Sequence, residues 1–113
     1  MYNKLNYKNE TAVIARQMLA LQMINTEAML IVMETQVDDI RECAVCIQED
    51  SFKLLQYLCT GSIDTVTVYA KERVSTVLGE IERRVIFIED RYKPEDTEYV
   101  RCETIIGHMQ QLW

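Results

Sequence analysis

Four cysteines and one histidine are the residues of this 113-residue chain with the greatest capacity for chemistry. Cys43 and Cys46 form a C-x-x-C pair, and residues three apart in one helix share a face, so both thiols can reach one metal ion. A complete site would combine Cys43, Cys46 and Cys59 with either Cys102 or His108. A zinc site that is recognisable from sequence usually has a second closely spaced pair of ligands, whereas the other candidates here are isolated. We therefore expect the cysteines to be packing residues, with no metal or cofactor bound, and keep a metal- or thiol-dependent helical module as an alternative function.

Other catalytic arrangements are incomplete in the same way. His108 follows Gly107 and lacks the neighbouring lysine that would hold a phosphate in a phosphotransfer protein. A di-iron bundle needs Glu-x-x-His motifs, but Ile105 stands three residues before His108. A serine triad lacks its strand-turn-helix scaffold. No glycine-rich phosphate loop is present, because the glycines are isolated at Gly61, Gly79 and Gly107. We therefore predict that the protein is not an enzyme.

The composition favours a single all-helical domain. Hydrophobic residues make up 49% of the chain, and there are only 3 glycines and 1 proline, so the turn residues that an all-β fold needs are scarce. The first eight residues are polar, and we expect them to form an N-terminal arm (1–8) ahead of one helical-bundle domain (9–113).

The charge and the apolar segments restrict partners and location. A formal net charge of −6 disfavours binding to nucleic acids and to anionic membrane surfaces. The polar start of the chain has no apolar segment typical of a signal peptide. The most apolar stretch, residues 18–33, is too short and too polar to span a bilayer. We expect a cytoplasmic protein, of the cell or of a host cell, without integral membrane association.

The first of the helices that would position these residues is predicted in a long segment from about Asn9 to Asp50, which contains no glycine or proline. Asn9 is a suitable N-cap for it. Apolar residues in its second half are spaced 3, 4, 3, 4 and 3 apart, the heptad pattern of a coiled coil: Leu30, Met33, Val37, Ile40, Ala44 and Ile47. A straight helix of this length would span ~60 Å at ~1.5 Å per residue. We expect it either to kink or fold back, near Asn25–Thr26, or to extend and pair with another chain.

The remaining segments are shorter and better delimited. Thr60-Gly61-Ser62 is the clearest break in the chain, with Gly61 suited to a helix end and Ser62 to the next helix start. Helical periodicity then persists from Ile63 to Tyr92, despite strand-like runs at 65–69 and 85–88. Pro94-Glu95-Asp96 is a favourable first turn for a last helix that ends near Trp113.

These segments predict an all-α, antiparallel bundle of three to four helices with a long first helix, dimerising through helix faces. Six methionines, four of them on the first segment, suit an adaptable binding surface. The leading prediction is therefore an acidic, non-enzymatic protein–protein interaction module, an adaptor, chaperone-like protein or modulator that forms a homodimer and binds another protein. A coat for an apolar surface, made by the wide apolar face of residues 12–33, is a further alternative. The residues predicted to form the interface are Leu19, Met23, Leu30, Met33 and Val37.

Overall fold

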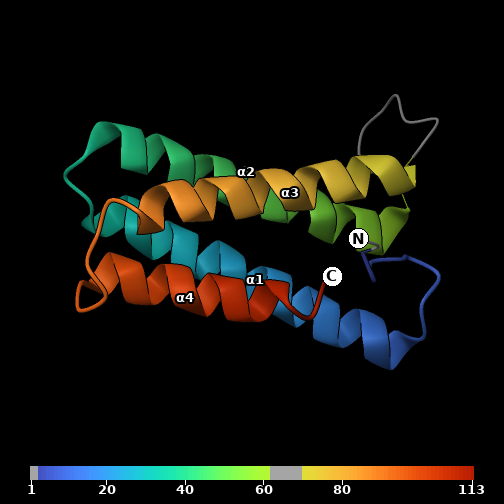
Figure 1. Cartoon of the computed structure of the whole chain (residues 1–113). Coiled ribbons are helices and arrows are strands. Elements are labelled where there is room, and N and C mark those ends of the chain that lie inside the picture. Colours follow the sequence, from blue (N-terminus) through green and yellow to red (C-terminus); the bar gives the residue numbers. More distant parts are fainter. Residues whose placement is uncertain (1–2, 62–69) are drawn as a thin grey trace.

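The computed structural model describes residues 3–61 and 70–113. Within this part every regular element is an α-helix: α1 (Thr11–Glu34), α2 (Asp38–Thr60), α3 (Ala70–Glu89) and α4 (Thr97–Met109). Successive helices run in opposite directions, and α1 and α3 each pack against both α2 and α4 (Figure 1). The predicted antiparallel all-α bundle is confirmed. No helix in the described ranges is long and apolar enough to cross a membrane.

The predicted long first helix is two helices, and the chain reverses at Thr35–Val37. Asn25–Thr26 is therefore the wrong place for the break. Thr35 adopts an extended backbone conformation, and its buried Oγ1 accepts a hydrogen bond from the backbone N–H of Val37 at 3.2 Å. Arg41 Nη2 donates to the Thr35 carbonyl at 2.8 Å, which ties the first turn of α2 back to the end of α1. These hydrogen bonds satisfy the Thr35 carbonyl at the end of α1 and the Val37 N–H at the start of α2.

Asn25 has a different role, since it joins α1 to α2 in the middle of their contact. Its Nδ2 donates to the Gln48 carbonyl at 3.0 Å and lies 3.2 Å from Ser51 Oγ. Ser51 is fully buried and donates in turn to the Gln48 carbonyl. Asn25 is thus a satisfied polar contact between two continuous helices, which explains why it does not interrupt α1.

The predicted break at Gly61 is confirmed. Gly61 has a φ of 76°, the left-handed conformation that favours glycine, and its N–H bonds to the Tyr57 carbonyl at 2.8 Å. An added Cβ would also meet the Tyr7 ring at 3.0 Å. Two separate constraints therefore favour glycine at the end of α2. Ser62, the predicted start of the next helix, lies outside the described residues.

The helix predicted from Ile63 to Tyr92 is observed from Ala70 to Glu89, and its first residues, 63–69, fall outside the described part of the chain. The strand-like run at 85–88 is helical, so the longer helical period prevails over local preference.

The predicted start of the last helix at Pro94 is wrong by three residues. Asp96 is the N-cap and α4 begins at Thr97, so Pro94 lies in the preceding turn. That turn is closed by hydrogen bonds in both directions between Lys93 and Asp96: the Asp96 N–H donates to the Lys93 carbonyl, and the Lys93 N–H donates to Asp96 Oδ2, each at 2.8 Å. Asp96 is thus held outside the helix, where its extended backbone suits an N-cap.

The arm at the N-terminus packs on the bundle. Leu5 is buried in the core, and the Lys4 N–H donates to the Leu112 carbonyl at 2.8 Å, which ties the two ends of the chain together. Asn9, predicted as the N-cap of the first helix, is displaced from that role by Glu10. The side chain of Asn9 donates instead to the Lys4 carbonyl at 3.0 Å.

One continuous core joins the helices. On α1 the buried stripe follows a heptad spacing, and α2, α3 and α4 contribute similar stripes of aliphatic side chains. The largest fully buried side chains are Leu5, Leu21, Ile24, Ile31, Ile40, Ile47, Leu54, Leu78, Ile81, Ile88, Ile105 and Leu112.

Ion pairs cross the contacts between helices. Arg84 of α3 donates to the buried Asp50 of α2 at 2.6 Å. Arg101 of α4 binds both carboxylate oxygens of Glu34 on α1, at 3.0 and 2.7 Å, and donates to Glu27 at 3.1 Å. Bidentate arginine–carboxylate geometry is the strongest form of such a pair, so Arg101 fixes how α4 sits along α1.

Candidate interaction surface

The residues predicted as an interface lie on the outside of the bundle. Leu19 and Met33 on α1 are 58% and 72% exposed, Met23 and Val37 are also exposed, and Leu30 is half-buried. Leu19, Met23, Leu30 and Met33 fall, with Thr26, in a second heptad row on α1, shifted by two residues from the buried stripe, whereas Val37 lies in the connection to α2. Two residues turn the helix by about 200°, so the two rows lie on opposite sides of it. We call this row, residues 19, 23, 26, 30 and 33, the outer stripe. The bundle does not use the outer stripe for its own core.

The outer stripe is almost free of charge. Between Gln17 and Met33 the only charged residue is Glu27, and its carboxylate is bound by Arg101. The exposed side chains of this stretch are uncharged: Leu19, Gln22, Met23, Thr26, Met29 and Met33. In a chain with a formal net charge of −6, such a surface is unusual and suits contact with protein more than with water.

The cysteines do not converge on one site. Cys43 and Cys46 are half-buried, Cys59 is exposed and Cys102 is buried. Among the described residues, no group of three or more histidine, cysteine, aspartate or glutamate side chains is arranged to hold a metal ion. Burial, with Cys46 nearby, raises the pKa of Cys43, and burial followed by repulsion from Glu89 raises the pKa of Cys102 to about 12. Both thiols therefore resist forming the thiolate that metal binding and redox chemistry require.

A double substitution tests the metal- and thiol-dependent alternative. We expect Cys43→Ser, Cys46→Ser to lower the free energy of unfolding by less than about 2 kcal/mol, because both side chains are only half-buried. We also expect EDTA to leave the melting temperature of the native chain unchanged, measured by circular dichroism. A fall of several degrees on chelation, absent in the double variant, would contradict the packing interpretation.

Glu89 of α3 has a buried carboxylate oxygen, Oε2, without a hydrogen-bond partner among the described residues. Burial, and then the neighbouring carboxyl of Glu103 on α4, raise the pKa of Glu89. The carboxylate of Glu89 therefore binds a proton more readily in the folded protein than in the unfolded protein. The stability associated with the protonated form is lost as pH rises through the raised pKa.

We expect Glu89→Gln to raise the free energy of unfolding by about 1 kcal/mol at pH 7.5, since a neutral amide avoids both the desolvation and the repulsion from Glu103. The gain disappears at pH 4, where Glu89 is itself protonated. Urea unfolding at the two pH values measures the effect, with Glu82→Gln, an exposed position on the same helix, as the control. An equal gain from Glu82→Gln would trace the effect to net charge instead of to the buried carboxyl.

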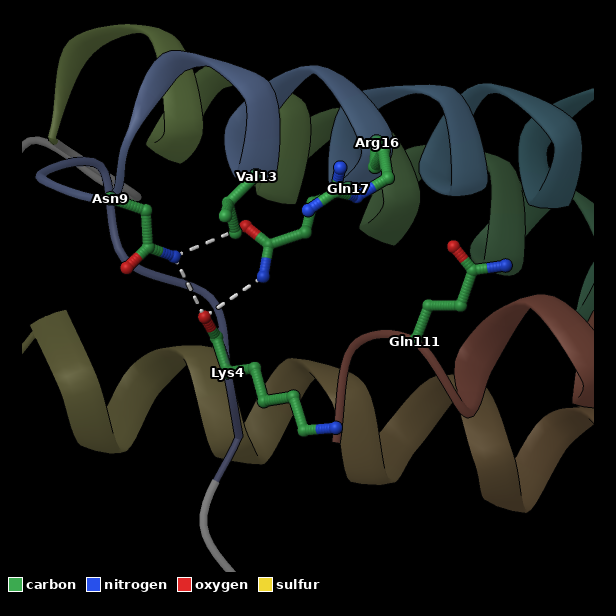
Figure 2. Close-up of a pocket in the computed structure, with 6 residues that line it drawn as sticks. All are labelled: Lys4, Asn9, Val13, Arg16, Gln17 and Gln111. Atoms are coloured by element: carbon green, nitrogen blue, oxygen red, sulfur yellow. Dashed lines mark hydrogen bonds between the residues drawn. The ribbon is translucent and has the colours of Figure 1, made fainter.

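A polar groove of 510 Å³ lies beside the first turns of α1, between the N-terminal arm and the C-terminal end of the chain (Figure 2). Gln17 is buried, and its Nε2 donates to the Lys4 carbonyl at 2.9 Å, which shapes the groove wall. The lining contains two cations and no acid, so the groove suits an anionic group but supplies no nucleophile or general acid. It is formed by Lys4, Asn9, Val13, Arg16, Gln17 and Gln111. The groove could not be predicted from the sequence, because its lining residues come from both ends of the chain.

Comparisons with known proteins add no relative: no family model, no curated protein and no solved structure matches this chain.

Proposed function

We propose that the protein is a non-enzymatic helical interaction module, acting in the cytoplasm, that self-associates through the outer stripe of α1. The observation that carries this proposal is the exposure of Leu19 and Met33 on a bundle whose core is already complete. Exposed apolar side chains are common singly, but Leu19, Met23 and Met33 share one heptad row, which is the pattern of a helix-pairing surface.

The charge distribution favours a second copy as the partner. Two chains that each carry a formal net charge of −6 repel one another, so they associate most easily through a face without acidic residues. The outer stripe meets that condition. A strongly basic partner would find few carboxylates there, because the two that lie nearby, Glu27 and Glu34, are both paired with Arg101.

Placing carboxylates on the outer stripe tests the proposal. We expect the native chain to sediment as a dimer at tens of micromolar, and Leu19→Glu, Met33→Glu to raise the dissociation constant by at least ~100-fold, because two charges per chain would be desolvated in the interface. Both positions are exposed in the single chain, so the circular dichroism spectrum and the folded state remain.

Val100→Glu is the control, because Val100 is an exposed aliphatic residue on α4 that does not belong to the outer stripe. It adds one carboxylate per chain, against two in the double variant, and leaves the dimer intact. Dissociation by Val100→Glu to the same extent would mean that general repulsion, and not the α1 surface, governs assembly. A native chain that stays monomeric at 200 micromolar would overturn the proposal.

A further inference from the structure

We infer that two copies pair through α1 in antiparallel orientation, with Thr26 of each copy at the two-fold axis. This inference rests on the proposed function and adds to it the orientation and register of the contact. A two-fold dimer uses the same patch on both copies, so the patch must match itself after rotation. The outer stripe matches itself in this way, because its residues lie at nearly equal spacings on the two sides of Thr26.

Thr26 stands at the centre of the stripe, seven residues from both Leu19 and Met33. In an antiparallel pair centred there, Leu19 of one copy faces Met33 of the other at each end. Met23 likewise faces Met29 and Leu30 of the second copy. Large apolar side chains thus meet large apolar side chains, while the small Thr26 meets itself and allows the helix axes to approach within the usual ~8–10 Å.

The charges at the ends of the stripe select the antiparallel orientation. Arg16 is exposed and makes no ion pair within the described residues, and Glu34, at the other end of α1, keeps its side chain 37% exposed beside Arg101. Arg16 lies ten residues before Thr26 and Glu34 eight residues after it, an axial difference of only ~3 Å in an antiparallel pair. Arg101 supplies one positive charge to two carboxylates, Glu27 and Glu34, so each Arg16 adds the second positive charge at the Glu34 of the second copy. A parallel pair would instead place Arg16 beside Arg16 and Glu34 beside Glu34.

Cysteine crosslinking distinguishes the two orientations. The background carries Cys43→Ala, Cys46→Ala and Cys59→Ser, and retains the buried Cys102. Into it are placed Thr26→Cys, Leu19→Cys or Met33→Cys, each on the exposed side of α1. A short bismaleimide then reports which pairs lie within reach, on a denaturing gel.

The antiparallel register predicts three results together. Thr26→Cys alone gives a crosslinked dimer, Leu19→Cys alone and Met33→Cys alone give at least tenfold less, and a mixture of the latter two gives a crosslinked heterodimer. Crosslinking of all three single variants would establish a parallel pair and overturn the inference. A dimer in sedimentation that none of the variants crosslinks would place the contact elsewhere and also overturn it. A monomer in sedimentation would remove the proposed self-association itself, so the two failures are distinguishable.

Discussion

Replacing Arg84 by methionine should lower the free energy of unfolding by about 3 kcal/mol at pH 7, because it leaves the carboxylate of Asp50 buried without its main partner. The side chain of Asp50 is only 7% exposed, and Arg84 Nη1 lies 2.6 Å from its Oδ2. The remaining cation, Lys53, has its Nζ at 3.8 Å from Oδ1 and is itself half-exposed, so it compensates weakly. Chemical denaturation of the purified chain measures the loss.

The pH dependence of this loss identifies its cause. Burial raises the pKa of Asp50 above its ordinary value even with Arg84 present, and removing the guanidinium raises the pKa further. A carboxyl whose folded-state pKa is raised binds a proton more readily in the folded chain, so folding becomes more favourable as pH falls through that pKa. The difference between the Arg84→Met variant and the native chain should therefore shrink between pH 7 and pH 4.

Two further variants test what causes the loss of stability in Arg84→Met: the unpaired charge of Asp50, the change in net charge, or lost packing. Arg83→Met removes a neighbouring, exposed arginine of α3 and should change the free energy of unfolding by less than ~0.5 kcal/mol. Adding Asp50→Leu to Arg84→Met removes the unpaired charge and should recover most of the loss, since an apolar pair often replaces a buried ion pair without cost. A double variant no more stable than Arg84→Met would locate the effect in lost packing.

The helix boundaries show which parts of the fold a sequence can reveal. Gly61 was predictable because a left-handed helix end has a chemical requirement that glycine meets best. The reversal at Thr35–Val37 contains neither glycine nor proline. Its hydrogen bonds use Thr35 and Arg41, residues that also occur within helices. A threonine turn of this kind is a weak local signal.

The heptad row concealed that reversal. Its first members, Leu30, Met33 and Val37, face outward from α1 and the connection, whereas Ile40 and Ala44 belong to the core of α2. The heptad spacing therefore continued without interruption from one helix to the next, although its residues passed from the surface to the core. Periodicity alone cannot separate an exposed apolar row from a buried one. The complete set of core and surface positions on α1 could not be derived from sequence for the same reason.

Adjacent residues on α1 test this division of the helix into two faces. Ile24 is fully buried, while Met23 is 36% exposed on the outer stripe. We expect Ile24→Ala to lower the free energy of unfolding by about 3 kcal/mol, from the lost transfer energy and the cavity that remains. Met23→Ala should change it by less than ~0.5 kcal/mol when unfolding is measured at 1 micromolar, where self-association contributes little.

The two variants should rank in the opposite order in association. Met23→Ala removes an apolar side chain from the proposed dimer contact and should weaken it severalfold in sedimentation at tens of micromolar, whereas Ile24→Ala should leave the dissociation constant of the folded chain nearly unchanged. Comparable losses of stability from both variants would mean that the outer stripe also belongs to the core of the single chain. The opposite ranking in the two assays is expected because α1 has two apolar faces, one that holds the bundle together and one that we propose pairs with a second copy.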